Sequence, residues 1–219
     1  MSTPTRRSTT GHAILGLLAL RPSWSTWELA TQLRRNMRFY WPRAESRVFA
    51  EARSLEERGW ARTKTTLVGR RQRTTYSITR AGRAELRRWL ASPPRGSSLE
   101  AEPILRFVLA DLAKPDELRA VLARVRADAQ AILDQGRVVA PEYLAGTAPF
   151  QDQVHIRAHL FDFLSHYAFM LLEWADRAEA GIAGWDQLSA EARDAAALEL
   201  IRTSLAQFPD PAGAGVSPT

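Results

Sequence analysis

The stretch PRAESRVFAEARSLEERGW, residues 42–60, decides the fold expected of this 219-residue chain. Pro42 suits the first turn of a helix, because its missing N–H would have no partner there. Gly59 suits the left-handed position at which such a helix ends. A rotation of about 100° per residue gathers the small and apolar side chains on one face, which is expected to pack on a core. These side chains are Ala44, Val48, Ala52 and Leu55.

The opposite face of this helix is basic. It presents Arg43, Ser46, Ala50 and Arg53, with Arg47 on its edge. Arginine can bond O6 and N7 of guanine bidentately, and serine is permissive, so this face suits the major groove of DNA. The first turns of a reading helix approach the bases, which favours Arg43, Ser46 and Arg47 over Arg53. The alternative is that these arginines only solvate an exposed helix face.

Two helices are expected before this one. Residues 12–20 are apolar nearly all round and predict a helix buried at the centre of the domain. Ser25 and Glu28 fit a capping box, in which each residue satisfies a backbone amide of the other. The capping box predicts a short helix that begins there and reaches residues 33–35.

A hairpin and a fourth helix are expected after Gly59. Residues 60–67 and 73–78 are rich in Thr, Val and Tyr and predict two strands, with a basic turn at 68–72 between them. Thr79 can cap the helix that follows and that ends before the prolines at 93–94. Helix, helix, helix and hairpin in this order predict a winged helix-turn-helix.

The hairpin itself is a second candidate DNA contact. Arg70, Arg71 and Arg73 lie at or beside the turn, and Lys64 lies on the preceding strand. Arginines this close repel one another unless an anion lies between them, and phosphates or a narrow minor groove would supply it. The alternative is a solubilising surface loop. Helix and wing together make double-stranded DNA the expected partner.

The first half of the chain resembles the PadR family of transcriptional regulators. The matching runs are HAILGLL at 12–18, WEL at 27–29, SRVF at 46–49, LEERGW at 55–60 and TYSITRAG at 75–82. The resemblance implies a homodimeric repressor whose C-terminal helices dimerise and sometimes sense small molecules. Many members have Ser-Gly-Tyr-Glu where this chain has STWE at 25–28, and Pro-Gly-Thr-Leu-Tyr at the start of the reading helix. The operator sequence therefore does not carry over.

Charge divides the chain in two. Residues 1–95 hold 20 Lys and Arg against 6 Asp and Glu, whereas residues 96–219 hold 10 against 18. A basic first half and an acidic second half indicate a nucleic-acid module joined to a different one. We expect a flexible basic arm at 1–10, the winged helix at 11–92, a linker at 93–102, a helical dimerisation domain at 103–208 and a disordered tail at 209–219.

Several classes of protein are excluded by composition and motif. The chain has no cysteine, so it forms no disulfide, and its longest apolar run, residues 13–20, is far short of the roughly 20 residues of a membrane span. No glycine-rich phosphate loop or nucleophile elbow is present, so we expect neither an enzyme nor a cofactor. A cytoplasmic transcriptional regulator is expected. The rival is a protein-interaction module whose basic winged helix binds an acidic protein.

An apolar seam in the second half is the expected dimer contact. It repeats at intervals of four and three residues, as in a coiled coil, and its own short helices are not expected to cover it fully. The seam consists of Leu118, Leu122, Val125, Ala129 and Ile132. A two-fold dimer would place two reading helices about 34 Å apart, so the operator is expected to be a pseudo-palindrome.

Two weaker constellations complete the list of candidate sites. Aromatic side chains of the expected dimer elements could stack on a small planar effector, or could form a packed core without a cavity. The ligand candidates are Trp89, Phe161, Tyr167 and Trp174. His155, His159 and His166 share one helix face and could bind a metal, but packed or solvent-facing histidines are favoured and no metal site is predicted.

Overall fold

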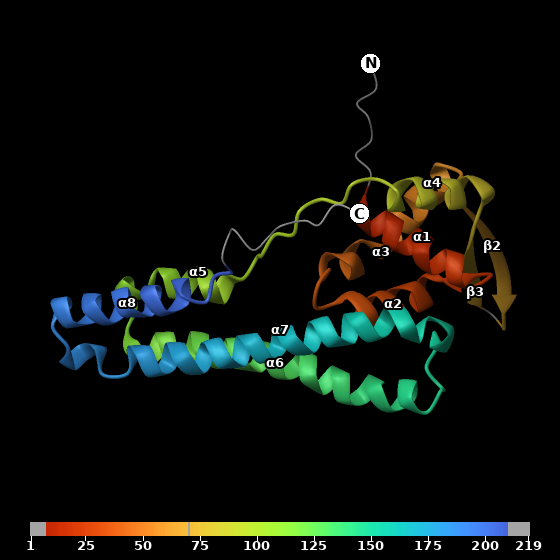
Figure 1. Cartoon of the computed structure of the whole chain (residues 1–219). Helices are drawn as coiled ribbons and strands as arrows, with labels where there is room; N and C mark the ends of the chain where they lie inside the picture. Colours follow the sequence, from red (N-terminus) through yellow and green to blue (C-terminus); the bar gives the residue numbers. More distant parts are fainter. Residues whose placement is uncertain (1–7, 70, 210–219) are drawn as a thin grey trace, which may run out of the picture. The chain divides into compact units, whose positions relative to one another are not determined.

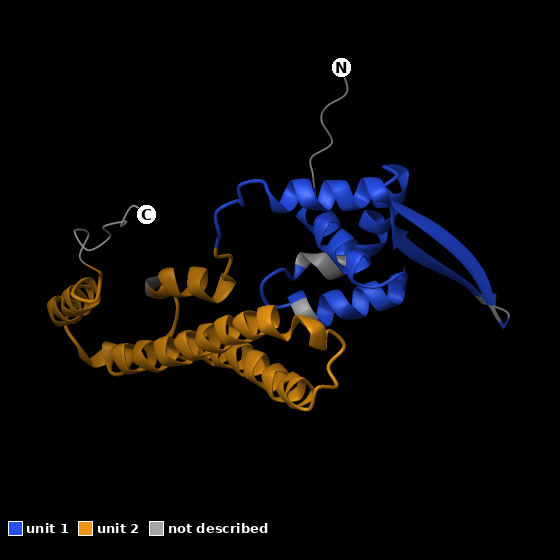
Figure 2. Cartoon of the chain, turned by 45° about the vertical axis from the view of Figure 1, so that its right-hand side comes forward, with its two compact units in different colours: residues 1–98 blue, residues 99–219 orange. Residues whose placement is uncertain are grey.

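The computed structural model describes residues 8–69 and 71–209, apart from the side chains at positions 36, 43–46, 68, 71, 111 and 115. The chain divides into two units, residues 1–98 and 99–219, and the boundary lies in a stretch without helix or strand at 93–101 (Figure 2). The fold is mainly helical with one small antiparallel sheet, as expected. Residues 1–7 of the expected arm and 210–219 of the expected tail lie outside the described residues.

The first unit has the element order of a winged helix (Figure 1). The elements are α1 (Thr9–Leu20), β1 (Trp24–Ser25), α2 (Thr26–Met37), α3 (Arg43–Glu57), β2 (Ala61–Val68), β3 (Arg71–Ile78) and α4 (Arg80–Leu90). The predicted helices and strands are confirmed, with small shifts of their ends. The sheet order is β1-β3-β2, with antiparallel pairing throughout.

Local side-chain bonds explain where the helices begin. Ser8 caps α1 by accepting a hydrogen bond from the Gly11 amide at 3.2 Å, so the helix starts before residue 12 and includes two residues of the expected arm. The predicted capping box of α2 is confirmed. The Glu28 amide donates to the Ser25 hydroxyl at 3.2 Å, and the Ser25 amide donates to the Glu28 carboxylate at 2.7 Å. Gly59 has a φ of 68°, the left-handed conformation predicted for it.

The wing differs from expectation at its turn and at its edge. Val68 pairs with Arg71, so the strands continue into the expected five-residue turn and leave only residues 69–70 between them. Gly69 has a φ of 61°, as such a tight turn requires. A third strand, β1, pairs Trp24 with Tyr76.

Apolar side chains of α1, α2 and α3 meet in the core of the first unit. On α3 the predicted core face is confirmed, because Val48, Ala52 and Leu55 are buried; the side chain of Ala44 is outside the described set. Each fully buried Val or Leu stabilises the fold by roughly 1.5–3 kcal/mol. The remaining large core residues are Ile14, Leu15, Leu17, Leu18, Trp24, Leu29 and Leu33.

A buried polar pair joins α1 to α4. The Nε2 atom of His12 lies 3.2 Å from the Glu85 carboxylate, and both side chains are 2% exposed. The Trp89 ring stacks on the His12 ring with a centroid distance of 4.8 Å. Glu85 also accepts a hydrogen bond from Arg88 at 2.7 Å. The contact satisfies two polar groups that burial alone would penalise.

The second unit is built on a pair of long antiparallel helices (Figure 1). Its helices are α5 (Glu102–Val108), α6 (Pro115–Leu144), α7 (Val154–Ile182) and α8 (Ala190–Leu205), with 3-10 turns at Ala110–Leu112, Gln151–Gln153 and Trp185–Gln187. The start of α6 packs on the end of α7. Arg126 of α6 donates to Asp176 and Glu179 of α7 at 2.8 and 2.6 Å, which joins the pair at its surface. None of the helices in the described ranges is both long and apolar enough to cross a bilayer.

Candidate nucleic-acid interface

The exposed face of α3 is the first part of the candidate interface. Because Val48, Ala52 and Leu55 are buried, the opposite side of the helix faces solvent, and Arg47 and Arg53 are exposed on it. The side chains of Arg43 and Ser46, which were also predicted to read DNA, lie outside the described residues. Arg53 lies close enough to Tyr76 of β3 to act on it electrostatically, although burial is the stronger effect and raises the pKa of the Tyr76 hydroxyl.

Two acidic side chains of α3 are engaged at its flanks. The Glu51 carboxylate accepts a hydrogen bond from the Ser8 hydroxyl at 2.5 Å, and the Glu56 carboxylate accepts one from the Thr63 hydroxyl of β2 at 2.5 Å. Glu57 is exposed in the last turn, at the end of the helix away from its first turns. Among the described side chains of α3, no carboxylate is hydrogen-bonded to Arg47 or Arg53.

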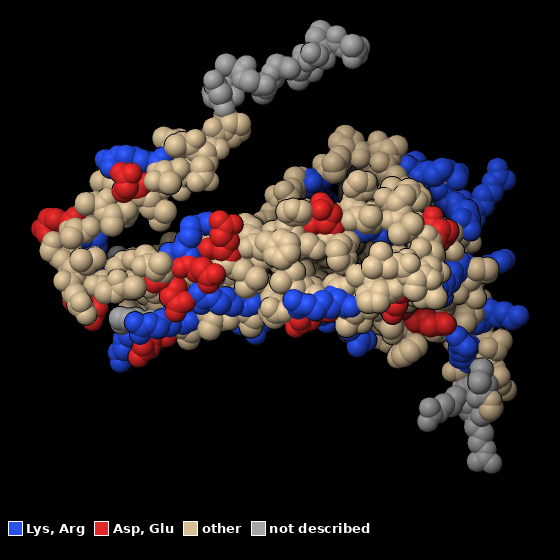
Figure 3. All heavy atoms as spheres, turned by 60° about the horizontal axis from the view of Figure 1, so that its bottom comes forward, with Lys and Arg blue, Asp and Glu red and all other residues tan. Residues whose placement is uncertain are grey.

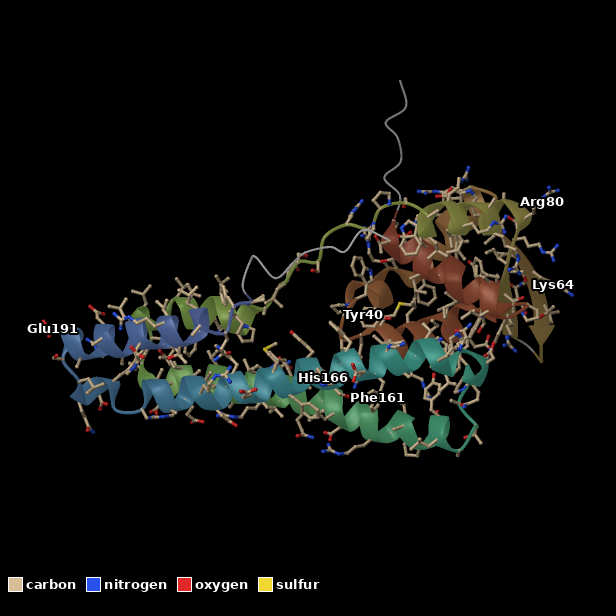
Figure 4. All side chains as sticks on the ribbon, viewed as in Figure 1. Tyr40, Lys64, Arg80, Phe161, His166 and Glu191 are labelled. Carbon is tan, nitrogen blue, oxygen red and sulfur yellow. The ribbon has the colours of Figure 1, made fainter. Side chains whose placement is uncertain are left out.

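The described basic residues of the wing, Arg62, Lys64 and Arg73, share one face of the hairpin. Thr63 contacts α3, and successive side chains of a strand point to opposite faces, so Lys64 lies on the face of the hairpin away from α3. Lys64 and Arg80 both lie at the outer edge of the first unit (Figure 4). Arg62, which the sequence analysis missed, is exposed and shares the face of Lys64. The strand alternation of residues 61–68 could have identified it.

Arg73 has an acidic partner within the chain. Its Nη2 atom donates to Oε2 of Glu28 on α2 at 3.1 Å, and both side chains remain partly exposed. Arg73 therefore joins the wing to the first turn of α2 in addition to its predicted contact with DNA. Arg70 and the side chain of Arg71 lie outside the described residues.

The charge distribution on the surface follows the division into units. Lys and Arg side chains gather over the end of the first unit where β2 and β3 lie, whereas acidic and basic side chains alternate over the second unit (Figure 3). Alternating pairs such as Arg119 with Asp116 and Arg137 with Asp134 neutralise one another on α6. The basic surface suited to a polyanion is therefore on the first unit.

The seam expected to make the dimer is buried within a single protomer. Ala129 and Leu122 have no exposed surface, and the other members are at most 7% exposed. Leu118, Leu122 and Val125 pack in one cluster with Ala175 and Ile182 of α7. The expectation that the chain's own helices leave this seam uncovered is wrong, because α7 is long enough to cover it. The complete seam is Leu118, Leu122, Val125, Ala129 and Ile132.

The four aromatic ligand candidates are divided between the two units of the chain. Trp89 belongs to the first unit, where it stacks on His12, whereas the other three lie on α7. Trp174 packs edge-on against Phe107 of α5 at 5.3 Å, and Tyr167 stacks on Phe163 at 6.5 Å. Phe161 is partly exposed near Gly136 of α6, and Figure 4 shows it on the first half of α7. Within the second unit, Tyr167 and Trp174 thus have different ring partners, and the role of the four residues in ligand binding stays a prediction.

A small pocket is present elsewhere in the second unit. It has a volume of about 190 Å³ and lies between the start of α6 and the end of α7, and it contains none of the four aromatic candidates. Its lining includes Leu118, Ile182, Trp185, Arg119 and Arg193. The wall combines an indole ring and aliphatic groups with two guanidinium groups and the carboxylate of Asp186, so it has apolar surface and polar groups of both charges.

The three histidines of α7 are exposed. The Nδ1 atom of His166 lies 3.3 Å from the carboxylate of Asp162, which is one helical turn earlier on the same helix. Across the described part of the chain, no group of three or more potential ligand side chains gathers around a common point. His155, His159 and His166 are thus surface residues of one helix.

Comparison with known proteins agrees with this geometry. No protein-family model matches the sequence. A curated protein of Mycobacterium tuberculosis, the probable transcriptional regulator Rv1176c, is 37% identical over 95 residues, which are 40% of this chain and 50% of that protein. The match thus spans about half the length of this curated relative.

Solved structures match more of the chain. Bacillus subtilis PadR in complex with operator DNA has a TM-score of 0.65 at 19% identity, over 80% of this chain and 99% of that one. The PadR-like regulator BC1756 from Bacillus cereus has a TM-score of 0.65 at 15% identity, with the same coverage. PadR of B. subtilis with p-coumaric acid has a TM-score of 0.60 at 18% identity, over 80% and 99%. The chain therefore has a PadR-like fold, a winged helix followed by a helical unit.

Proposed function

We propose that this chain is a DNA-binding transcriptional regulator of the PadR type that forms a homodimer and represses transcription. The observation that carries the proposal is the exposed face of α3, on which Arg47 and Arg53 lie opposite a buried apolar back. The sequence likeness to a probable transcriptional regulator and the fold likeness to an operator-bound PadR support the same assignment. DNA is read by α3 in the major groove, and the wing contacts the backbone.

The homodimer is proposed to form through apolar side chains that the protomer leaves exposed. On α8, Leu198, Ile201 and Leu205 recur at helical spacing on one face, and no residue of that helix is buried. Further exposed apolar residues lie on α5 and on the turn after it, namely Leu105, Val108, Leu109 and Leu112. Exposed apolar side chains in this number favour association, and an isologous contact would relate two copies by a two-fold axis.

A small aromatic ligand is proposed to release the operator. PadR of B. subtilis has been solved with p-coumaric acid, which supports a planar aromatic acid as the ligand class. The pocket beside Trp185 is a candidate seat for it, because Arg193 can pair with a carboxylate while the indole stacks on the ring. A ligand can shift operator affinity only by its own differential affinity for two states of the protein.

Selection from a random duplex pool, followed by titration at rising salt, tests the DNA-binding function. We expect a pseudo-palindromic sequence to be enriched and its log affinity to fall linearly with log salt, with a slope of about −0.9 per phosphate contact. Absence of duplex binding even at low salt would overturn the proposal in favour of an acidic protein partner. Tryptophan fluorescence with planar aromatic acids, in the wild type and in Trp185→Phe, tests the ligand.

A further inference from the structure

Phe49 stands among the basic residues of α3 with its ring open to solvent. Its exposed fraction is 68%, although it lies in the middle of a helix that buries Val48 and Ala52 on its other side. Single exposed apolar side chains are common on proteins, so exposure alone carries no function. The position of this ring on the helix is what distinguishes it.

The ring lies on the flank of the face assigned to DNA. At about 100° per residue, Phe49 and Arg53 are separated by about 40° around the helix and by one turn along it. Ala50, which is exposed beside them, has the smallest side chain on this face, so a base edge can approach the helix there. Arg47 lies on the other flank of Ala50. An apolar group is thus placed within the same surface as two groups that can donate hydrogen bonds to bases.

The carboxylate of Glu56, on the same side of α3 as the ring, is held by the wing. Glu56 is about 20° from Phe49 around the helix and two turns along it, and its carboxylate accepts a hydrogen bond from Thr63. Phe49 itself has no ring stacking or cation contact among the described residues. The ring is therefore available to a partner that approaches α3 from solvent.

Only one base offers an apolar group in the major groove. Thymine presents its C5-methyl there, whereas the other bases present donors and acceptors alone. We infer that Phe49 contacts thymine methyl groups in each half-site and so makes the operator require thymine at fixed positions beside those read by arginine. This inference rests on the proposed function and extends it to the base composition of the operator.

Replacement of thymidine by 2′-deoxyuridine tests the inference, because it removes the methyl group and keeps every hydrogen-bonding group of the base. The experiment uses the full chain and the duplex selected from the random pool, with one thymine replaced at a time. We expect the wild type to lose about fourfold in affinity for each methyl group that it buries, at one or two positions in each half-site. Phe49→Ala should bind the thymine duplex more weakly and show no further loss with deoxyuridine at those positions.

Trp27→Ala is the matched control, since Trp27 is an equally exposed aromatic residue of the same unit, at 72%, but lies on α2. It should keep the wild-type penalty for deoxyuridine. If the wild type binds both duplexes equally at every position, or if Phe49→Ala keeps the penalty, the inference is overturned. The proposed function survives that result as long as the wild type still prefers the selected duplex over random DNA, and it fails only if that preference is absent.

Discussion

The guanidinium of Arg73 on β3 lies 3.1 Å from the carboxylate of Glu28 on α2. The same carboxylate oxygen accepts hydrogen bonds from the amide and the hydroxyl of Ser25, at 2.7 and 2.6 Å. One acidic side chain therefore caps a helix of the helix-turn-helix and also ties the wing to it. The carboxylate thus adds a side-chain contact between the wing and α2 to the backbone pairing of β1 with β3.

We predict that Glu28 makes the stability of the first unit sensitive to acid. The Ser25 hydroxyl, then the Ser25 amide and Arg73, lower the pKa of Glu28 from its ordinary value of 4.5. A lowered pKa in the folded state means that the stabilisation is present above the unfolded value and is lost as the pH falls through the folded one. The free energy of unfolding from urea titrations should fall on acidification below about pH 4.5 in the wild type, and less so in Glu28→Gln.

Two further variants show which interaction contributes most to the lowered pKa of Glu28. Ser25→Ala removes the largest cause of the lowered pKa and should flatten the acid dependence more than Arg73→Met, which leaves the capping box in place. The reverse order would mean that the ion pair, and not the capping box, dominates the energetics of Glu28.

Arginines of the reading helix should contribute to specificity and those of the wing to affinity in general. Arg43→Ala, Arg47→Ala and Arg53→Ala should each cost about 1–3 kcal/mol in operator binding if the side chain contacts a base edge. Arg70→Ala and Arg71→Ala should weaken binding to all duplexes alike and flatten the salt slope by about one. Fluorescence anisotropy with the operator and with random duplex measures both.

The control for these variants is Arg137→Ala on α6, where the guanidinium pairs with Asp134 of its own helix. It should leave affinity and salt slope unchanged. Operator preference that persists in Arg47→Ala and Arg53→Ala would show that α3 does not read the bases.

A methyl group at Gly82 should destabilise the first unit strongly. A Cβ there would lie 2.1 Å from the carbonyl oxygen of Trp60, a backbone atom that cannot easily move because it accepts a hydrogen bond from the Thr79 amide. Gly82→Ala should therefore cost about 3 kcal/mol, the upper end of the range for overpacking. Gly16→Ala is the matched control, because a Cβ at Gly16 on α1 has no neighbour within 4 Å. It should stabilise the unit by about 0.5–1 kcal/mol, and equal effects of the two variants would contradict the packing described here.

Core and dimer should respond to different substitutions in the second unit. Leu122 is fully buried against α7, so Leu122→Ala should lower the free energy of unfolding by about 2–5 kcal/mol. Ile201 and Leu205 are exposed on α8, so Ile201→Glu with Leu205→Glu should keep the helical circular dichroism and yield a monomer in light scattering. Most of the affinity for a two-half-site operator should be lost with the dimer. A wild-type chain that is monomeric at micromolar concentration would contradict the dimer itself.

The local sequence pattern was sufficient to predict those parts of the chain whose hydrogen bonds and packing contacts join residues that are close in the sequence. The apolar back of α3, the capping box of Ser25 and Glu28, and the left-handed Gly59 were all predicted, because each depends on a fixed spacing along one helix or at its end. The basic front of α3 follows from the same periodicity, which is why the candidate interface could be proposed before the fold was known.

Only the tertiary structure decided which distant residues meet. The strand β1 has two residues, which are too few to show the alternation of apolar and polar side chains that identifies a strand in a sequence. It forms because Trp24 pairs with Tyr76 of β3. The seam from Leu118 to Ile132 was correctly apolar, but its partner is α7 of the same protomer, a choice that spacing along α6 cannot encode. Arg73 was correctly basic and exposed, but its pairing with Glu28 spans 45 positions. Such contacts depend on how close folding brings two segments that are far apart in the sequence. The residue pattern of either segment alone does not determine the distance between them.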